Sequence, residues 1–234
     1  IKEKESRIEH LATHDELTGL PNRVLFTDGL QHSIARAERN EKQCFVLFID
    51  LDNFKLVNDS FGHSAGDELL KEASRRVFDC VRSQDTVARW GGDEFVVSLE
   101  DIETEQVTVI TNRIIDYLSA SYSVLGKKVY VSASIGISCY PLDGEDVDSL
   151  LRSADTAMYK SKDSGKNQLQ YFSEDLRLIV ERRFALETGI RHGLENEQFH
   201  MVFRPEIDLQ TGRCIALEAL MRWTSGDLGV VAPD

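Results

Sequence analysis

The stretch RWGGDEFVVSL, residues 89–99, places two glycines and two adjacent acids directly before an apolar run. With the preceding residues TVA it has the pattern of two strands joined by a tight turn, because Gly91 and Gly92 both tolerate positive φ. A β-hairpin with solvated acids is the simpler interpretation of Asp93 and Glu94. The alternative is a metal and phosphate site at the mouth of a buried strand, and the rest of the sequence has to decide between them.

A second acidic pair ends the stretch CFVLFIDLD, residues 44–52. Its uninterrupted apolar run predicts a strand that is buried on both faces. Asp50 and Asp52 are two residues apart, so both side chains lie on the same side of such a strand. An Asp at this place caps a following helix or binds a cation, since Mg²⁺ in proteins takes one or two carboxylates together with substrate phosphates. The cation site is favoured if this strand and the hairpin are neighbours in one sheet.

The chain up to residue 172 alternates between helical and strand patterns. Hydrophobic periodicity predicts helices over 23–40, 53–59, 66–82, 104–122 and 146–165, and further strands over 128–138 and 167–172. This order of elements predicts an α/β fold, an α+β sandwich with a central, mostly antiparallel five-stranded sheet flanked by helices. Residues 58–67, NDSFGHSAGD, are predicted to form a polar loop.

Two groups of polar side chains accompany the acids. Lys160, Lys162 and Lys166 surround the end of the 146–165 helix, where lysines either match the helix dipole in solvent or hold phosphates. Asn58 and Asp67, in the predicted polar loop, serve as turn or helix-start residues in the simpler interpretation. An Asp together with an Asn also matches the donors and acceptors of a guanine edge.

Composition excludes several classes of protein. The chain has 234 residues and a net charge of −13, which disfavours non-specific binding to nucleic acid. The longest apolar run, 44–49, is too short to span a bilayer. The four cysteines are far apart and form no CxxC pair, which indicates reduced thiols and not a disulfide framework or a zinc site. We therefore expect a cytoplasmic segment, whose full-length protein can still carry a membrane tether outside it.

The two ends of the chain differ in character from its middle. Residues 1–12 are charged, with apolar residues near heptad spacing, and are expected to be the end of a signalling coiled coil from an upstream domain. Residues 173–234 contain a long charged helix followed by two strands around a DLQTGR turn. Because one helix and two strands cannot bury a core alone, we expect this part to begin a second domain.

Five linked motifs together carry a resemblance to a known family. They are DELTGLPNR (15–23), FIDLDNFKLVNDSFGHSAGD (48–67), RSQDTVARWGGDEF (82–95), SIGIS (134–138) and ADTAMYKSKDSGKN (154–167). In this order, residues 13–172 resemble the GGDEF family of diguanylate cyclases, which condense two GTP molecules into cyclic di-GMP and release two pyrophosphates. The resemblance implies a fold similar to that of nucleotidyl cyclases and polymerase palm domains.

The resemblance also implies roles for single residues. Asp50, Asp93 and the Leu51 carbonyl would bind metal, two Mg²⁺ or Mn²⁺ ions per active site, and Glu94 would lie near the reacting 3′-hydroxyl, which makes Asp93 and Glu94 the expected catalytic acids. The implied GTP-binding residues are Asn53, Phe54, Lys55, Asn58, His63, Asp67, Lys162 and Lys166. Many relatives have Arg where Lys166 stands, so the charge is kept and bidentate geometry is lost. Because each domain would bind one GTP, catalysis is expected to need a homodimer.

A regulatory site is implied by the motif RSQD, residues 82–85. Its distance from GGDEF matches the RxxD product-inhibition motif of the family, so Arg82 and Asp85 are expected to bind cyclic di-GMP, with Arg113 as a helper. Without that offset, a helix-terminal Arg and a turn Asp would be the preferred interpretation.

The C-terminal part carries a second resemblance. Residues 217–223, LEALMRW, resemble the start of the EAL phosphodiesterase domain, a TIM-like barrel that hydrolyses cyclic di-GMP. This implies Glu218 as a metal ligand and Arg222 as a phosphate contact. Arg204 stands where active relatives usually carry Gln, which puts ligand binding there in doubt. The segment is too short for phosphodiesterase activity, and a packing remnant is the preferred interpretation.

Two functions remain open from the sequence. The leading one is an active, product-inhibited diguanylate cyclase with an upstream sensor and a downstream EAL domain in the full-length protein. The alternative is an inactive GGDEF module that binds GTP or cyclic di-GMP and regulates an attached EAL phosphodiesterase. All the acids expected at the site are present, which favours the cyclase.

Overall fold

The computed structural model describes residues 11–226 and 229–231. The coiled coil expected over residues 1–12 therefore lies almost wholly outside the described residues. The chain divides into two compact units between Arg177 and Leu178, and each is described by itself. No helix in the described part of the chain is long and apolar enough to cross a membrane.

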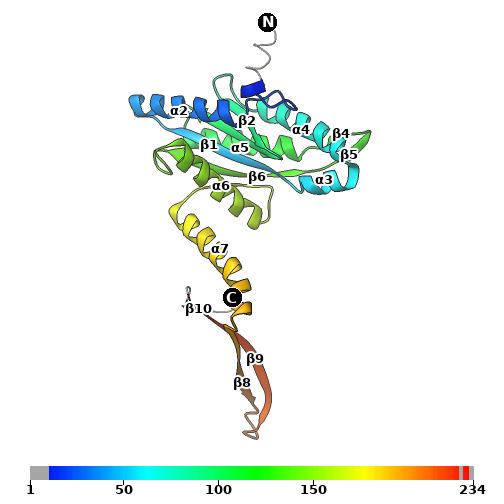
Figure 1. Ribbon diagram of the computed structural model, residues 1–234, viewed down its shortest axis with the longest axis vertical. Helices are drawn as coiled ribbons and strands as arrows, with labels where there is room; N and C mark the ends of the chain where they lie inside the picture. Colours follow the sequence, from blue (N-terminus) through cyan, green and yellow to red (C-terminus); the bar gives the residue numbers. More distant parts are fainter. Residues whose placement is uncertain (1–10, 227–228, 232–234) are drawn as a thin grey trace. The chain divides into compact units, whose positions relative to one another are not determined.

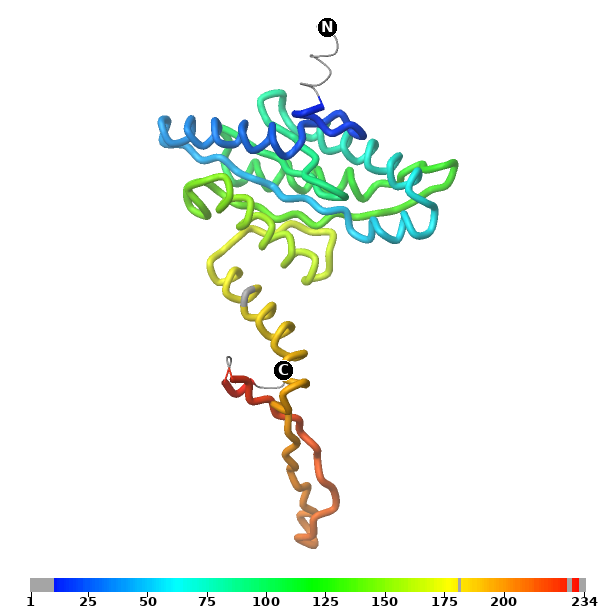
Figure 2. The backbone as a smooth tube through the Cα atoms, viewed as in Figure 1, coloured from blue at the N-terminus to red at the C-terminus, as the bar shows by residue number. Residues whose placement is uncertain are grey.

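The first unit is built on a mixed five-stranded sheet (Figure 1). Its strands, in spatial order, are β2 (Thr86–Gly91), β3 (Glu94–Glu100), β1 (Cys44–Asp52), β6 (Ser132–Tyr140) and β7 (Leu169–Tyr171). All neighbours are antiparallel except β6 and β7, which run parallel. Figure 2 shows β1 and β6 side by side although 80 or more residues separate their paired positions. The predicted sheet is confirmed, and the acid-bearing strand and the hairpin are neighbours in it.

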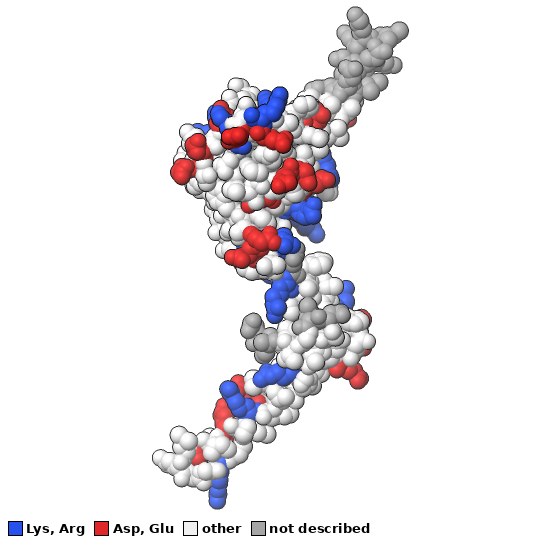
Figure 3. Space-filling model, turned by 90° about the vertical axis from the view of Figure 1, so that its left-hand side faces the viewer, with Lys and Arg blue, Asp and Glu red and all other residues white. Residues whose placement is uncertain are grey.

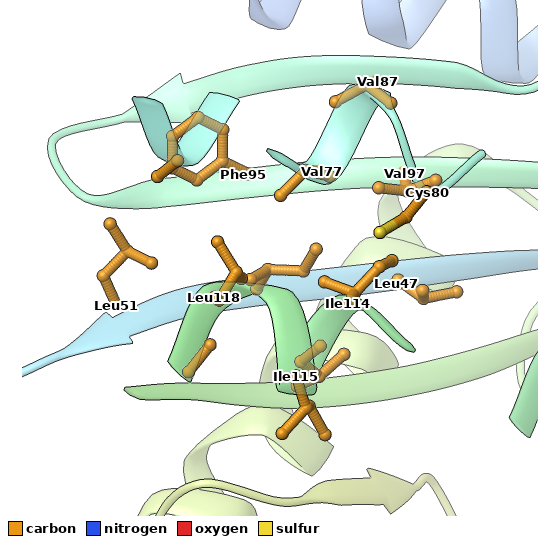
Figure 4. Packing of buried hydrophobic residues seen from close by; sticks show 14 of the residues in the cluster. Leu47, Leu51, Val77, Cys80, Val87, Phe95, Val97, Ile114, Ile115 and Leu118 are labelled. Carbon is orange, nitrogen blue, oxygen red and sulfur yellow. The ribbon is translucent and has the colours of Figure 1, made fainter. Parts of the chain in front are cut away.

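Helices cover both faces of this sheet. They are α2 (Arg23–Asn40), α3 (Phe54–Phe61), α4 (His63–Phe78), α5 (Thr104–Ser119) and α6 (Val147–Asp163). Side chains of β1 alternate between two apolar clusters: Leu47 and Leu51 pack with residues of α4 and α5, and Val46 and Phe48 with residues of α2 and α6. Figure 4 shows Leu47 and Leu51 on the side of the sheet that α5 covers. Burial on both faces explains why β1 is apolar from Cys44 to Ile49.

The region predicted as a polar loop is helical. Residues 58–61 end α3 and residues 63–67 begin α4, with only Gly62 between them. Gly62 has φ of 84°, which residues with a Cβ rarely adopt, so a single glycine provides the change of direction. Most of the polar residues lie on the exposed sides of these two helices. The helix predicted over 66–82 therefore begins earlier, at His63, and ends earlier, at Phe78.

The region after α5 also differs from the prediction. The helix ends at Ser119 and not at residue 122. Arg76 donates hydrogen bonds to the carbonyl oxygen of Tyr117 in its last turn and to those of Ala120 and Ser121 just beyond it. Two short strands, β4 (Tyr122–Val124) and β5 (Lys127–Val129), follow as a separate hairpin. The strand predicted over 128–138 is β6, over Ser132–Tyr140, and it is buried along almost its whole length and not on one face alone.

Gly136 of the SIGIS motif brings α6 close to the sheet. A Cβ at this position would lie 1.9 Å from the Ala154 carbonyl oxygen and 2.1 Å from the Met158 nitrogen. Only glycine therefore permits this approach. The close packing fixes the height of α6 above β6, and α6 carries Lys162 toward the acids of β1.

The second unit contains most of the predicted helix, the two predicted strands and one further short strand. The helix α7 (Glu174–Glu195) begins four residues before this unit. Ser173 Oγ caps the first turn of α7 by accepting from Leu176 N at 3.2 Å. The strands are β8 (Phe199–Ile207), β9 (Cys214–Ser225) and β10 (Gly229–Val231). Most side chains of β8 and β9 are exposed, whereas Trp223 is buried and stacks on Phe199 at 5.2 Å between ring centroids.

Candidate active site

The hairpin turn consists of Gly92 and Asp93. Gly91 pairs with Glu94 in the ladder, so the turn lies one residue further along than the predicted Gly91-Gly92. Of the two glycines only Gly92 has positive φ, at 51°. The shift places Asp93 in the turn itself and Glu94 at the first position of β3.

The acids of the two strands meet as predicted. Glu94 is the cross-strand partner of Asp50, and directly opposed residues project from the same face of a sheet. The Leu51 nitrogen donates to the Asp93 carbonyl oxygen at 3.3 Å, which joins the end of β1 to the turn. The side chain of Leu51 points the other way, into the core. Asp50, Asp93 and Glu94 therefore form one acidic cluster at the edge of the α6 face.

Burial and mutual repulsion act on these acids. Burial raises the pKa of Asp50 even though Lys162 Nζ lies 2.6 Å from its Oδ2, and the charges of Asp93 and Asp52 add to the rise. Burial likewise raises the pKa of Glu94, with Asp50 and then Asp155 of α6 as the next causes. Raised pKa values at two facing carboxylates indicate negative charge that lacks a full counter-charge.

This acidic cluster fits a divalent cation that arrives with phosphates. In residues 11–226 and 229–231, no three His, Cys, Asp or Glu side chains are arranged to hold a metal ion by themselves. Mg²⁺ seldom uses an all-protein site and usually combines one or two carboxylates with substrate oxygens and water. Buried carboxylates with raised pKa values, beside a single lysine, are suited to that combination.

Lys166 and the start of α3 lie together. Lys166 Nζ donates to Asn53 Oδ1 at 2.9 Å, and Asn53 precedes the first residue of α3. The first backbone N–H groups of a helix are free to bind anions. Lys55 is exposed there, whereas the side chain of Phe54 is buried. The predicted phosphate-binding residues thus meet at one place, next to the acidic cluster on β1.

The predicted guanine-binding residues lie where α3 packs against α4. A Cβ on Gly66 would lie 2.0 Å from Asn58 Oδ1, so the missing side chain of Gly66 makes room for the Asn58 amide. Asp67 follows Gly66, and His63 is one helical turn earlier on the same helix; both are exposed. Asn58, Asp67 and His63 are therefore brought together by the two helices.

Arg82 and Asp85 form a local ion pair. Arg82 Nη2 lies 2.9 Å from Asp85 Oδ1, and the Arg82 backbone nitrogen also donates to this carboxylate, at 2.9 Å. A further bond runs from Arg82 Nη2 to the Glu100 carbonyl oxygen at 2.7 Å. Arg113 donates to the carbonyl oxygen of Cys80, two residues before Arg82. Arg82 is not helix-terminal, since α4 ends at Phe78.

Arg89 was not predicted as a site residue. Its Nη1 contacts both carboxylate oxygens of Asp15, at 3.1 and 3.0 Å, and its Nε and Nη2 donate to the Gly92 carbonyl oxygen at 3.1 and 2.7 Å. Although burial acts in the opposite direction, hydrogen bonds from Thr18 and the pairing with Arg89 hold the pKa of Asp15 below its usual value. Arg89 therefore ties the turn that carries Asp93 to the DELTG segment.

If the reaction implied by the family resemblance takes place here, Arg89→Lys is expected to lower its turnover number about tenfold. Lysine keeps the charge but cannot contact Asp15 and Gly92 together, so the turn loses a fixed position and the reacting groups lose alignment. The KM for the implied nucleotide substrate should change less, because the residues expected to bind its phosphates and base do not contact Arg89. Initial-rate kinetics check this, with Arg39→Lys on the exposed side of α2 as the matched control. Equal turnover in the two variants contradicts a positioning role.

Glu218 and Arg222 lie on β9 of the second unit. Glu218 is paired with Arg204 of β8, with Nη2 2.6 Å from Oε2, and both side chains are partly exposed. Arg222 is four residues further along the strand, so it projects from the same face as Glu218. The residue that replaces the expected Gln thus neutralises the predicted metal ligand.

A mixed sheet flanked by helices, with paired acids at a hairpin and lysines at helix ends, defines an α/β domain of the nucleotidyl cyclase class. Residues 12–168 match the family described as diguanylate cyclase, GGDEF domain. The chain belongs to this family. It is also similar in structure to the GGDEF domain of TpbB (YfiN) from Pseudomonas aeruginosa, with a TM-score of 0.70 and 36% identity over 72% of this chain and 99% of that one.

Several longer proteins are also similar to this chain. The bifunctional diguanylate cyclase/cyclic di-GMP phosphodiesterase MucR of Pseudomonas aeruginosa is 40% identical over 95% of this chain and 33% of its own length. The cyclic di-GMP phosphodiesterase PdeR of Escherichia coli is 37% identical over 98% and 34%. The coiled coil and GGDEF domain of DgcB from Caulobacter crescentus, in complex with c-di-GMP, is 26% identical over 73% and 91%, with a TM-score of 0.67. The chain thus spans about a third of the length of MucR and of PdeR.

Proposed function

We propose that the first unit is a diguanylate cyclase that condenses two GTP molecules into cyclic di-GMP. The observation that carries the proposal is the facing pair Asp50 and Glu94, with Asp93 beside them and Lys162 in contact with Asp50. A reaction at a triphosphate requires groups that bind a metal cation, neutralise charge and bind phosphate, and these carboxylates and the lysine can supply them.

Each site residue has a role in this proposal. Asp50, Asp93 and the Leu51 carbonyl would hold Mg²⁺ or Mn²⁺, which when bound lowers the pKa of the 3′-hydroxyl and offsets charge on the pyrophosphate. Glu94 would lie next to the reacting 3′-hydroxyl. Lys162 bonds Asp50 in this structure, so it has to exchange this carboxylate for a phosphate when a metal-bound nucleotide enters.

The nucleotide would extend from the acids toward α3 and α4. Lys166, which contacts Asn53, and the N-terminal backbone of α3 would hold phosphates. Asn58, beside Gly66, and Asp67 would bind guanine, and His63 would contact the nucleoside. One such site holds one nucleotide, whereas the cyclic product contains two. We therefore infer that two copies of the domain face each other during catalysis.

Product inhibition is the second part of the proposal. Arg82 and Asp85, with Arg113 beside them, would bind cyclic di-GMP through its phosphates and guanine edges. In this structure Arg82 and Asp85 satisfy each other, so ligand binding has to replace their ion pair. Because Arg82 also holds the carbonyl oxygen of Glu100, the last residue of β3, this exchange would act on the strand that begins at Glu94.

The test is incubation of the protein with GTP and Mg²⁺, with chromatographic detection of cyclic di-GMP. We expect product from the wild type and none from Asp93→Ala, since the variant lacks one of the cation-binding carboxylates. The rate per molecule should rise with protein concentration if two domains are needed. GTP binding without any product at high protein concentration contradicts the cyclase.

A second candidate is a GGDEF module that binds GTP or cyclic di-GMP and regulates an attached phosphodiesterase. It is favoured by relatives such as PdeR and the cyclic di-GMP phosphodiesterase NbdA, which is 34% identical over 97% of this chain. Under this candidate residues 173–234 lead into an EAL domain, in which Glu218 is the first metal ligand. Nucleotide binding without turnover supports it and argues against the first candidate.

A further inference from the structure

Asp52 is a buried carboxylate for which the proposed chemistry has no role. It ends β1 and is 2% exposed. Its Oδ2 accepts from Ser132 Oγ at 2.6 Å and from Asn167 N at 3.2 Å, and its Oδ1 accepts from Ser134 Oγ at 2.8 Å. Three donors therefore satisfy a side chain that the sequence pairs with Asp50.

The surroundings of Asp52 differ from those of Asp50. Asp50 is the last residue of the β1–β3 ladder, opposite Glu94, and also pairs with Ser134 of β6, whereas Asp52 lies beyond that ladder and pairs only with Ser132 of β6. Asp50 thus faces other acids and a lysine, and Asp52 faces hydroxyl groups and a backbone amide. A carboxylate whose two oxygens already accept three hydrogen bonds needs no cation to be stable in the interior.

The amide that Asp52 binds belongs to a strained turn. Lys166 and Asn167 have φ of 63° and 49°, two successive residues with a Cβ in the left-handed region. Such residues visit this region singly, and two in succession persist only where the surroundings hold them. The turn is held by Lys166 N, which donates to the Ser161 carbonyl oxygen at 3.1 Å, and by the bond from Asn167 N to Asp52.

This turn determines where the Lys166 ammonium lies. With the turn in place, Lys166 Nζ reaches Asn53 Oδ1, at the start of α3, 2.9 Å away. Asn53 directly follows Asp52 in the chain. Asp52 therefore holds the turn that carries Lys166, and the next residue, Asn53, accepts the hydrogen bond from the Lys166 ammonium. A relaxed turn would release the ammonium from the helix N-terminus.

We propose that Asp52 is a positioning residue, which holds the strained turn at Lys166 and Asn167 so that Lys166 binds a phosphate group of the substrate at the start of α3. The ligand is a polyphosphate anion, such as the pyrophosphate part of a nucleoside triphosphate. This role depends on the proposed function in one respect, which is that Lys166 binds a phosphate of the substrate. Asp52 is not a metal ligand, despite its two-residue spacing from Asp50.

The main test is Asp52→Asn, with Asp116→Asn on the exposed side of α5 as the matched control. Hydrogen exchange of the backbone amides of residues 164–168, measured without nucleotide, should become faster in Asp52→Asn only. Pyrophosphate should bind about tenfold more weakly, as expected for one lost hydrogen bond to a charged group. Affinity for Mn²⁺ alone should stay within about twofold, because the acids that face Glu94 are unchanged.

Each outcome decides one point. Unchanged exchange at 164–168 overturns the proposal, whether or not the protein converts GTP. Faster exchange with unchanged pyrophosphate affinity also overturns it, because Asp52 then only braces the turn. A large loss of Mn²⁺ affinity shows that Asp52 is a metal ligand. Absence of cyclic di-GMP from the wild type refutes the cyclase but leaves the exchange and pyrophosphate measurements valid.

A second pair of variants applies if Asp52→Asn does not fold. Asn167→Gly and Asn167→Ala both remove the hydrogen bond from Ser119 Oγ to the Asn167 side chain. Glycine adopts the left-handed conformation freely and alanine does not. Pyrophosphate should therefore bind more weakly to Asn167→Ala than to Asn167→Gly. Equal pyrophosphate affinities of the two variants contradict the proposal.

Discussion

Asp50→Asn should reduce the rate of cyclic di-GMP formation about a thousandfold. Asparagine has nearly the same shape, so the β1 ladder to β3 and β6 is kept, but the carboxylate that faces Glu94 is lost. A cation-binding carboxylate accounts for several kcal/mol of transition-state stabilisation, and each 1.36 kcal/mol is about tenfold in rate. Initial rates measured by chromatography check this, with Asp28→Asn, 70% exposed on α2, as the control.

The same variant should be more stable than the wild type at neutral pH. Burial raises the pKa of Asp50, so the folded protein binds this proton more tightly than the unfolded chain does. The charged carboxylate therefore lowers stability at pH values above its raised pKa, and this cost is absent below the ordinary carboxyl range. The melting temperature of Asp50→Asn should rise above that of the wild type as pH increases from the ordinary carboxyl pKa to the raised pKa of Asp50, and the difference should then level off. A less stable Asp50→Asn protein at neutral pH would mean that the ion pair with Lys162 outweighs the cost of burial.

Stability and activity are thus expected to move in opposite directions at this cluster. Asp50 and Glu94 face each other on adjacent strands, and the charge that destabilises the fold is the charge that attracts a cation with its nucleotide. Bound metal and nucleotide would supply the missing counter-charge and so stabilise the folded protein. A carboxylate cluster of this kind is kept for binding and not for folding.

The meeting of these acids could be predicted from the sequence because it follows from local pattern. The apolar run of β1 and the alternation of β3 each indicate a strand, and the acids stand at the strand ends that neighbours in an antiparallel sheet bring together. The turn position was wrong by one residue, since a glycine pair does not show which glycine takes positive φ. Gly92 takes it because Gly91 already pairs with Glu94.

Other features of the site depend on tertiary contacts that no local pattern contains. Arg89 and Asp15 are 74 residues apart, so their ion pair could not be predicted from spacing. Asp50 and Asp52 lie on one face, as predicted, but their roles separate because Asp50 has partners on both β3 and β6, whereas Asp52 has a partner on β6 alone. The polar residues around Gly62 resemble a loop in composition, and packing of α3 against α4 overrides that local preference.

The packing of α3 against α4 also predicts a large loss of GTP affinity in Gly66→Ala. The added Cβ would lie 2.0 Å from Asn58 Oδ1 and 3.0 Å from Phe54 Cζ. The Asn58 amide is the end of a flexible side chain, so it should turn away rather than unfold the helices. Two lost hydrogen bonds to guanine, at about 1.5 kcal/mol each, correspond to roughly a hundredfold weaker GTP binding. Calorimetric titration with a non-hydrolysable GTP analogue measures this.

Stability should change little in Gly66→Ala, because the gain of about 1 kcal/mol from alanine in a helix offsets the contact with Phe54. Gly29→Ala is the matched control, since Gly29 is also helical and a Cβ there meets nothing within 4 Å. It should keep full GTP affinity. If the clash acts through Asn58, the double variant with Asn58→Ala should bind GTP no more weakly than Asn58→Ala alone. An additional loss in the double variant would show that Gly66→Ala acts through the helix packing and not through Asn58.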